Sequence, residues 1–209
     1  MSLLTELHYL GCITYFAELF KHPSIVFEQY EFFEKSTYRN RCYIAGSNGI
    51  LMLSIPLVGG RHQHRTISKD VLIDYSYNWQ KVHWNSIESA YQSSAFFDYY
   101  ADALQPSYLV KPAFLFDFNY TLLQVILKLL RTEIASSFTR SYNKHYESDE
   151  IIDFRNCIHP KQLKQTGHFN YPFPAYFQIF AHKYGFLPNL SILDLMFAKG
   201  PETLNYLTS

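Results

Sequence analysis

The N-terminal stretch constrains the fold most, because it alternates strand, helix and strand. Residues 3–9 are predicted to form a short first strand, and Gly11 to Phe20 carries apolar side chains at helical spacing. Ser24 to Tyr30 is rich in β-branched and aromatic residues and predicts a second strand. Two strands joined through a helix usually lie parallel in one sheet. The sequence therefore predicts a βαβ-like start and a partly parallel sheet.

The rest of the chain supplies a hairpin and several helices. The segment 41–57 is predicted to be a β-hairpin around the Asn48-Gly49 pair. Further strands are predicted over 71–74, 136–142 and 175–180, and helices over 78–92, 95–104, 112–131, 191–198 and 202–207. A chain of 209 residues is long enough for one good hydrophobic core. We predict a single α/β domain over residues 1–209, with a mixed sheet and C-terminal helices; an α+β arrangement is the alternative.

The composition narrows the partners and the compartment. Lys plus Arg and Asp plus Glu number 18 each, so the formal net charge is zero and no nucleic-acid partner is expected. Cys12, Cys42 and Cys157 lack CxxC spacing, which predicts neither a disulfide framework nor a cysteine zinc site. No signal-peptide pattern is present, and the longest apolar stretch, Leu122 to Leu130, is far short of the ~20 residues of a membrane span. These features predict a cytoplasmic protein without a membrane span.

A basic segment at the start of the hairpin is the first candidate site. If Arg39 to Tyr43 is extended, Arg39 and Arg41 lie on one face. Two neighbouring guanidinium groups suit a carboxylate or a phosphate. We therefore predict a phosphate-binding wall formed by Tyr38, Arg39, Asn40 and Arg41. Two alternatives stay open: the arginines lie on a solvated strand edge, or they pair with acidic neighbours, namely Glu28, Glu31 or Glu34.

The predicted helix over 78–92 provides the second wall. At ~100° per residue, Trp79, Gln80, His83 and Trp84 fall in one arc together with apolar residues. The charged side chains of this helix fall on the opposite face. His83 is therefore predicted to point inward, with both tryptophans of the chain beside it.

Roles follow from these residue types. An imidazole with its ordinary pKa of ~6.5 suits a general base, so His83 is the predicted base. Asp74 precedes the helix and is the predicted group that orients His83 or accepts from Arg41. Trp79 and Trp84 would stack on a sugar or nucleobase, and Gln80 would add a hydrogen bond. The alternative is a core histidine satisfied by a backbone carbonyl or a carboxylate.

Established catalytic motifs are absent from the sequence. There is no Walker A, G-x-G-x-x-G, G-x-S-x-G or H-E-x-x-H pattern. His62 and His64 lie in a glycine-rich loop without further convergent ligands, so neither a metal nor another cofactor is predicted. Asp194 follows Ser191 by three residues and is predicted to act as a capping residue at a helix start.

Several motifs, in order along most of the chain, resemble the WbqC-like family. They are Glu28 to Glu31, Lys35 to Cys42, Asn48-Gly49, Leu53 to Pro56, Ile73 to Tyr75, Asn78 to Trp84, Ala90-Tyr91, Asn189 to Asp194 and Gly200 to Glu202. The chain is most similar to the compact version found in Bacteroidetes. It departs from the family at Gly11, where members usually have the proline of a Tyr-Leu-Pro turn, and the stretch between Arg131 and Tyr171 is shorter.

The resemblance implies a context rather than a reaction. Members are associated with gene clusters for O-antigen and other surface polysaccharides. The family resemblance therefore implies a transferase acting on a nucleotide-linked, amino-type sugar, with that phosphorylated small molecule as its partner. A non-catalytic binding or assembly protein of a polysaccharide locus is the alternative from another functional class.

Overall fold

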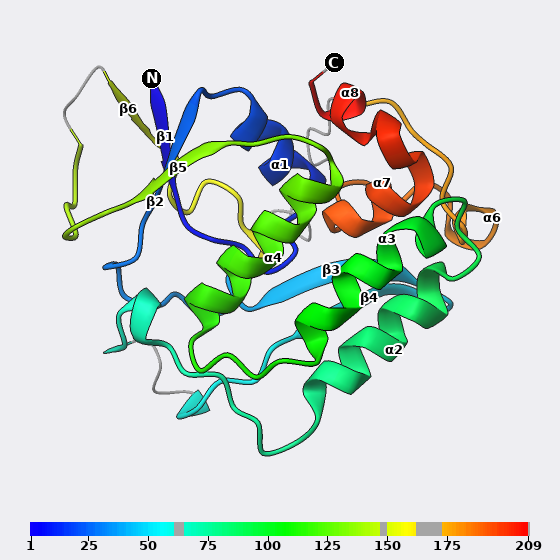
Figure 1. The fold of residues 1–209 in the computed structure, drawn as a ribbon, viewed down its shortest axis with the longest axis horizontal. Coiled ribbons are helices and arrows are strands. Elements are labelled where there is room, and N and C mark those ends of the chain that lie inside the picture. The colour runs from blue at the N-terminus through cyan, green and yellow to red at the C-terminus, as the bar shows by residue number, and fades with distance from the viewer. Residues whose placement is uncertain (61–64, 147–149, 162–172, 209) are drawn as a thin grey trace.

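The computed structural model describes residues 1–60, 65–146, 150–161 and 173–208. Two separate sheets form within these residues (Figure 1). One has four strands in the order β5-β2-β1-β6, and the other is the β3–β4 hairpin. The strands are β1 (Ser2–Thr5), β2 (Ser24–Phe27), β3 (Arg41–Gly46), β4 (Gly49–Ser54), β5 (Ala135–Phe138) and β6 (Ile151–Asp153). The predicted α/β class is confirmed.

The N-terminal βαβ unit is confirmed in detail. Strands β1 and β2 are parallel, with Leu3 opposite Ile25, and α1 (Ile13–Phe20) connects them. The helix buries Ile13, Phe16 and Ala17, which is the apolar face that their spacing predicts. Strand β1 ends at Thr5, earlier than predicted, so the chain from Glu6 to Cys12 is a connection rather than strand.

The remaining helices surround the hairpin and one end of the sheet. They are α2 (Trp79–Tyr91), α3 (Phe97–Leu104), α4 (Leu115–Leu129), α6 (Ala181–Tyr184), α7 (Ile192–Lys199) and α8 (Thr203–Thr208), with short 3₁₀ turns η2 (Ser68–Asp70), η3 (Gln105–Tyr108) and η4 (Gly200–Glu202). Helix α4 crosses the middle of the molecule, between the parallel sheet and the α2–α3 pair (Figure 1). Within the described residues, no helix combines the length and apolar character needed to cross a bilayer.

All pairings in the four-stranded sheet are parallel, and this decides where ligands can be expected. Strand β2 lies on one side of β1, and β6 lies on the other. Strand β5 extends the sheet beyond β2. In open α/β sheets, ligands bind outside the carboxyl ends of the strands, where the strand order changes direction. Here that place is the carboxyl end of β1, where Glu6 begins the connection to α1.

Three predicted segments were wrong. Residues 112–114 do not start α4: Ala113 accepts from the backbone of Ile73, and Phe114 forms a bridge with Leu72. Those bridges also replace the predicted strand over 71–74. Residues 175–180 form no strand. Strand β6 was not among the predicted strands.

The start of α7 is confirmed at Ser191, whose hydroxyl accepts from the Leu193 N–H at 3.4 Å. Asp194 was wrongly predicted to be a capping residue. Its buried carboxylate instead accepts from the Tyr91 hydroxyl at 2.8 Å, the Gln178 amide at 2.7 Å and the Tyr176 hydroxyl. Asp194 therefore links α7 to α2 through Tyr91. It also links α7 to the irregular segment that contains Tyr176 and Gln178.

Candidate functional site

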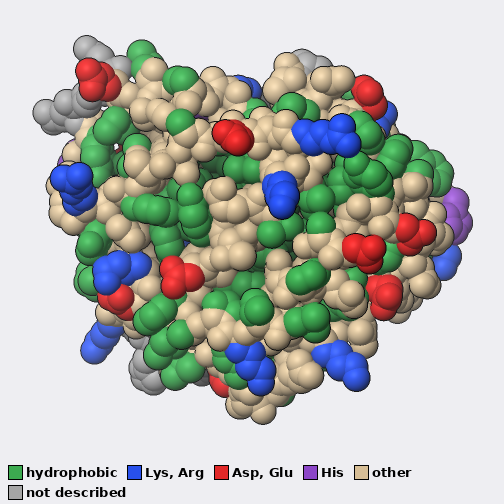
Figure 2. Space-filling model, in the orientation of Figure 1, with side chains coloured by type: hydrophobic (Ala, Val, Ile, Leu, Met, Phe, Trp, Pro, Cys, Tyr) green, Lys and Arg blue, Asp and Glu red, His purple; other side chains and the backbone are tan. Residues whose placement is uncertain are grey.

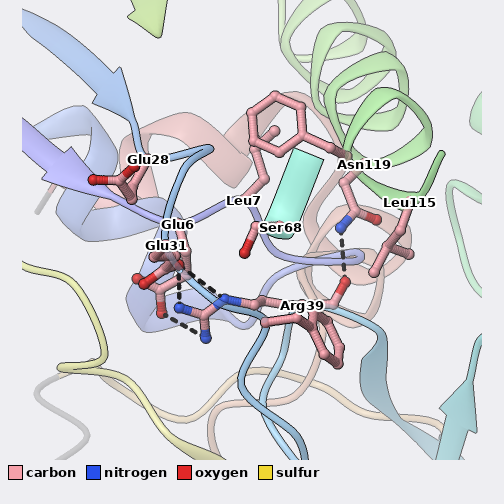
Figure 3. Close-up of a pocket in the computed structure, with 10 residues that line it drawn as sticks. Glu6, Leu7, Glu28, Glu31, Arg39, Ser68, Leu115 and Asn119 are labelled. Atoms are coloured by element: carbon pink, nitrogen blue, oxygen red, sulfur yellow. Dashed lines mark hydrogen bonds and ion pairs between the residues drawn. The ribbon is translucent and has the colours of Figure 1, made fainter. Parts of the chain in front are cut away.

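Charged side chains gather just beyond the carboxyl ends of three parallel strands. Glu6 and His8 follow β1, Glu28 and Glu31 follow β2, and Arg155 follows β6, while Arg39 reaches them from the turn before β3. We call Glu6, His8, Glu28, Glu31, Arg39 and Arg155 the carboxyl-edge cluster. Several of its members are labelled in Figure 3. Glu6, His8, Glu28, Glu31 and Arg39 are each at most 6% exposed.

Arg39 is the centre of this cluster. Its Nε donates to Glu31 Oε1 at 3.1 Å, and its Nη2 donates to the same oxygen. Its Nη1 lies 3.9 Å from Glu6 Oε1, and its Nη2 also donates to Asn156 Oδ1 at 2.9 Å. One guanidinium group thus serves two buried carboxylates. For Arg39, the structure therefore agrees with the alternative in which the arginines pair with acidic neighbours, here with Glu31.

A second guanidinium holds the other side of the cluster. Arg155 Nη1 donates to Glu28 Oε2 at 3.1 Å, while its Nε and Nη2 donate to the two oxygens of Asp153 at 2.9 and 2.6 Å. Its guanidinium lies 5.2 Å from the ring centres of both Tyr142 and Tyr146. Arg155 is therefore fixed by its neighbours and links β6 to the end of β2.

Glu6 and His8 form a dyad. His8 Nε2 lies 3.1 Å from Glu6 Oε1, and the Asn156 N–H donates to Glu6 Oε2 at 3.0 Å. The His8 ring stacks on Tyr15 with a centroid distance of 4.0 Å. His8 Nδ1 is buried and has no hydrogen-bond partner within the residues that the structure describes. An oriented imidazole with one unbonded nitrogen is a possible proton acceptor.

The environment separates the pKa values of the two carboxylates that share Arg39. Burial raises the pKa of Glu6, but the hydrogen bond with His8 and the charge of Arg39 outweigh burial and lower it to about 2. Burial raises the pKa of Glu31 to about 7, because the nearby Glu6 and Glu28 charges add to the effect and Arg39 offsets only part of it. Burial also lowers the pKa of His8. Glu6 is thus ionised, His8 is neutral, and Glu31 titrates near neutrality.

The cluster borders a small cavity under the first turn of α4. The cavity has a volume of about 10 Å³ and is lined by Glu6, Glu28, Glu31, Arg39, Ser68, Asn119 and apolar side chains. That volume holds about one water-sized group. The Asn119 amide donates to the Arg39 carbonyl at 2.7 Å, which fixes the α4 side of the cavity (Figure 3).

His83 belongs to a different, neutral network. Helix α2 points it inward as predicted, and its Nδ1 lies 2.8 Å from the Tyr9 hydroxyl, which lies 2.8 Å from the Tyr108 hydroxyl. We call Tyr9, His83 and Tyr108 the His83 network. Burial lowers the pKa of His83 to about 4, against the effect of a backbone hydrogen bond with Ser54. His83 is 3% exposed, so the structure gives it the geometry of a satisfied core histidine.

The predicted phosphate-binding residues have different surroundings. Strand β3 begins at Arg41, and Arg39 lies in the preceding turn, where its guanidinium donates to Glu31 and Asn156. Arg41 is half-buried, with Nη1 3.8 Å from the sulfur of Met52. The Asn40 amide donates to the Ile55 carbonyl at 2.9 Å and extends the hairpin. Tyr38 is buried beside His8, at a ring distance of 5.3 Å.

The other predicted residues also have identified surroundings. Asp74 accepts from the Ser76 N–H at 2.8 Å, which is a local turn rather than the expected contact with His83. The Gln80 amide donates to the Val110 carbonyl. Trp79 and Trp84 are buried, and Trp79 packs edge-on against His83 at 5.0 Å. Trp79, Gln80 and Trp84 are thus packed into the protein interior, and their ligand-binding roles stay predictions.

No set of three or more histidine, cysteine, aspartate or glutamate side chains is arranged to hold a metal ion within the described ranges. His62 and His64 lie outside these ranges. Charged side chains on the face shown in Figure 2 are mixed in sign, without a broad basic patch.

Sequence reasoning missed Glu6, His8, Arg155 and Asn156. The usable signal was position: each follows a strand of the parallel sheet, and carboxyl ends of parallel strands meet at one edge. The predicted strand over residues 3–9 hid Glu6 and His8, because it placed them inside a strand.

A model of the WbqC-like protein family matches residues 8–206. The chain belongs to the WbqC-like protein family. It is also similar to the uncharacterized protein Rv1507c of Mycobacterium tuberculosis, with 30% identity over 200 residues, 84% of this chain and 83% of the relative. No solved structure matches the chain. The match confirms the resemblance drawn from the sequence motifs, and it includes His8 and Arg39 of the cluster.

Proposed function

We propose that this WbqC-like protein is a cytoplasmic enzyme of surface-polysaccharide biosynthesis, a transferase that acts on a nucleotide-linked amino sugar. The sequence resemblance supports the polysaccharide context. The carboxyl-edge cluster supports the enzymatic part, because it lies where open α/β sheets bind ligands. We therefore place the proposed reaction at the carboxyl end of β1 and not at His83. Arg39 is a ligand-site residue in both proposals.

The observation that carries the proposal is the burial of charge at this edge. Glu6, Glu28, Glu31 and Arg39 are each at least 94% buried. Burying an ion costs several kcal/mol, and well-packed apolar residues often stabilise a fold equally well. Charged groups whose burial separates their pKa values are typical of functional sites. A purely structural core gains little from such an arrangement.

The cluster has the groups that acid–base catalysis needs. His8, neutral and oriented by Glu6, is the proposed general base. Glu31, with a pKa of about 7, is the second proposed acid–base group. Arg39 stabilises negative charge that develops between them. Arg41, half-buried at the start of β3, is the proposed phosphate contact outside the cluster.

One observation favours a second candidate, a non-catalytic binding or assembly protein of a polysaccharide locus. The cavity at the cluster measures about 10 Å³, which admits a water-sized group but no sugar ring. In this alternative the cluster fixes the β1–α1 connection, and its ionisable groups transfer no protons.

Complementation distinguishes the two. Deletion of the gene in its host is expected to remove or alter a surface polysaccharide, measured by gel profile and sugar composition. Wild type and Glu88→Gln, an exposed carboxylate on α2, should restore it. His8→Gln and Glu31→Gln should not restore it, although purified samples remain folded by circular dichroism.

Three other results decide against parts of the proposal. Restoration by every folded variant supports the non-catalytic alternative. An unchanged polysaccharide after deletion overturns both candidates. Thermal-shift measurements with nucleotide-linked sugars test the substrate class: no rise in melting temperature with any of them, for a wild-type protein that complements, excludes that class.

A further inference from the structure

The cavity beside the carboxyl-edge cluster has an excess of negative charge. Three buried carboxylates line it, those of Glu6, Glu28 and Glu31, and Arg39 is the cation among its lining residues. Arg155 pairs with Glu28, but it also pairs with Asp153, so its charge is shared between two carboxylates. His8 adds no charge when it is neutral. The cavity is therefore balanced only if it gains a positive charge or a proton.

Hydrogen bonding at the cavity is incomplete, because the buried donor Arg39 Nη1 and two buried oxygens lack partners within the described residues. Glu31 accepts from Arg39 through Oε1 alone, and no hydrogen bond to its Oε2 is found within the described residues. Ser68 Oγ is buried without a partner in the same part of the chain, and so is Asn119 Oδ1. Figure 3 shows the Ser68 hydroxyl on the side that faces the Arg39–Glu31 pair. Ser68 is 93% buried, so bulk water does not satisfy it.

Size limits what can enter. A volume of about 10 Å³ fits one group of the size of water. Phosphate is larger and would meet three carboxylates. A compact ammonium group has the right size, three donors and the missing charge.

We propose that this cavity is a subsite for the primary ammonium group of the substrate, held by the Glu31 carboxylate and the Ser68 hydroxyl. The subsite rests on the proposed function in one respect: the ammonium would be that of the amino sugar. Binding of an ammonium group needs no turnover, so the subsite can be tested separately.

The raised pKa of Glu31 is consistent with this assignment. Burial raises it, Arg39 lowers it, and the Glu6 and Glu28 charges raise it further, to about 7. A proton on Glu31 balances the cavity when no cation is present. A bound ammonium replaces that proton and leaves Glu31 ionised.

The experiment uses methylammonium chloride as the probe and the purified full-length protein. Tetramethylammonium chloride at equal ionic strength is the control salt, because it has the same charge without N–H donors. Methylammonium is expected to raise the melting temperature saturably, by about 3–6 °C at ten times its Kd. Tetramethylammonium should produce no such rise.

Variants locate the binding. Glu31→Gln should abolish the methylammonium-specific rise. Ser68→Ala should weaken the affinity roughly tenfold or more, and it should fold normally because its hydroxyl has no partner to lose. Ser107→Ala, a buried serine in η3 away from the cavity, is the matched control and should bind like wild type.

Two results overturn the subsite. One is equal rises with both salts, and the other is no saturable rise at all, which means that the cavity takes only water. These outcomes are separate from the proposed function. A polysaccharide defect on deletion without methylammonium binding removes the subsite alone, whereas binding without any defect removes the proposed function alone.

Discussion

The carboxyl-edge cluster and the His83 network begin at adjacent residues of one connection. His8 turns into the charged cluster, and Tyr9 turns into the neutral network. Both regions are buried, and both join segments that are distant in the sequence. They differ in charge: the cluster contains buried ions, whereas the network contains two phenols and an imidazole with a pKa of about 4.

This difference helps to separate buried polar groups of the core from those of a candidate ligand site. In the His83 network, neutral groups bond one another at 2.8 Å and are surrounded by rings, so the network contributes to the core. In the cluster, Arg39 pairs with the carboxylates of Glu6 and Glu31, and a third buried carboxylate, that of Glu28, pairs with Arg155. Burial alone therefore does not distinguish a core histidine from a ligand site, and neither do unpartnered atoms, since Trp79 Nε1 and Trp84 Nε1 beside the His83 network also lack partners within the described residues. The buried charge distinguishes them.

The largest expected effect is on the charged side. Arg39→Ala leaves Glu6 and Glu31 buried without their shared cation, which should lower the free energy of unfolding by about 3–5 kcal/mol. Urea denaturation at neutral pH measures this change. Arg41→Ala is the matched control, because Arg41 is half-buried and makes no ion pair within the described residues; we expect a loss of about 1 kcal/mol or less. Equal losses in both variants would contradict the assignment of Arg39 as the centre.

The two regions should respond to pH with opposite sign. Glu31 has a folded pKa of about 7 against 4.5 unfolded, so its contribution is complete below pH 4.5 and is lost as the pH rises through 7. His83 has a folded pKa of about 4 against 6.5, so its contribution is complete above pH 6.5 and is lost as the pH falls through 4. Each amounts to about 3 kcal/mol.

Urea denaturation at pH 7 and pH 5 separates these contributions. Compared with wild type, Glu31→Gln should lose more stability between pH 7 and 5, and His83→Gln should lose less. Glu88→Gln, with its exposed carboxylate, should follow wild type. A change of the same sign in both test variants would mean that the two regions do not differ in charge as described.

The smallest effect lies within the His83 network. The Tyr9 hydroxyl contacts both His83 and Tyr108, so Tyr9→Phe leaves two buried polar groups without a partner and should cost about 1–3 kcal/mol. Tyr108→Phe removes only one of these bonds and should cost about 1 kcal/mol. Thermal and urea denaturation of both variants check the order. A larger cost for Tyr108→Phe would show that Tyr9 is not the centre of the network.

Local patterns predicted much of the fold. Helical periodicity correctly placed α1 and α2 and turned His83 inward, because side chains three and four residues apart share a helix face. The Asn48-Gly49 pair correctly placed the hairpin, with Gly49 at a φ of 103°. Strand β6 has only three residues, too few for a recognisable period, and it escaped prediction.

By itself, the sequence determined the family, the α/β class and the parallel β1–β2 pair, because these depend on short-range order along the chain. Only the tertiary structure decided which polar residues meet. Asn156 is distant in sequence from both Glu6 and Arg39, and the parallel pairing of β1 with β2 and β6 brings Glu6, Glu31 and Asn156 to one edge. Whether a histidine or an arginine is buried depends on the segments that pack around it, and the periodicity of its own segment does not predict those contacts.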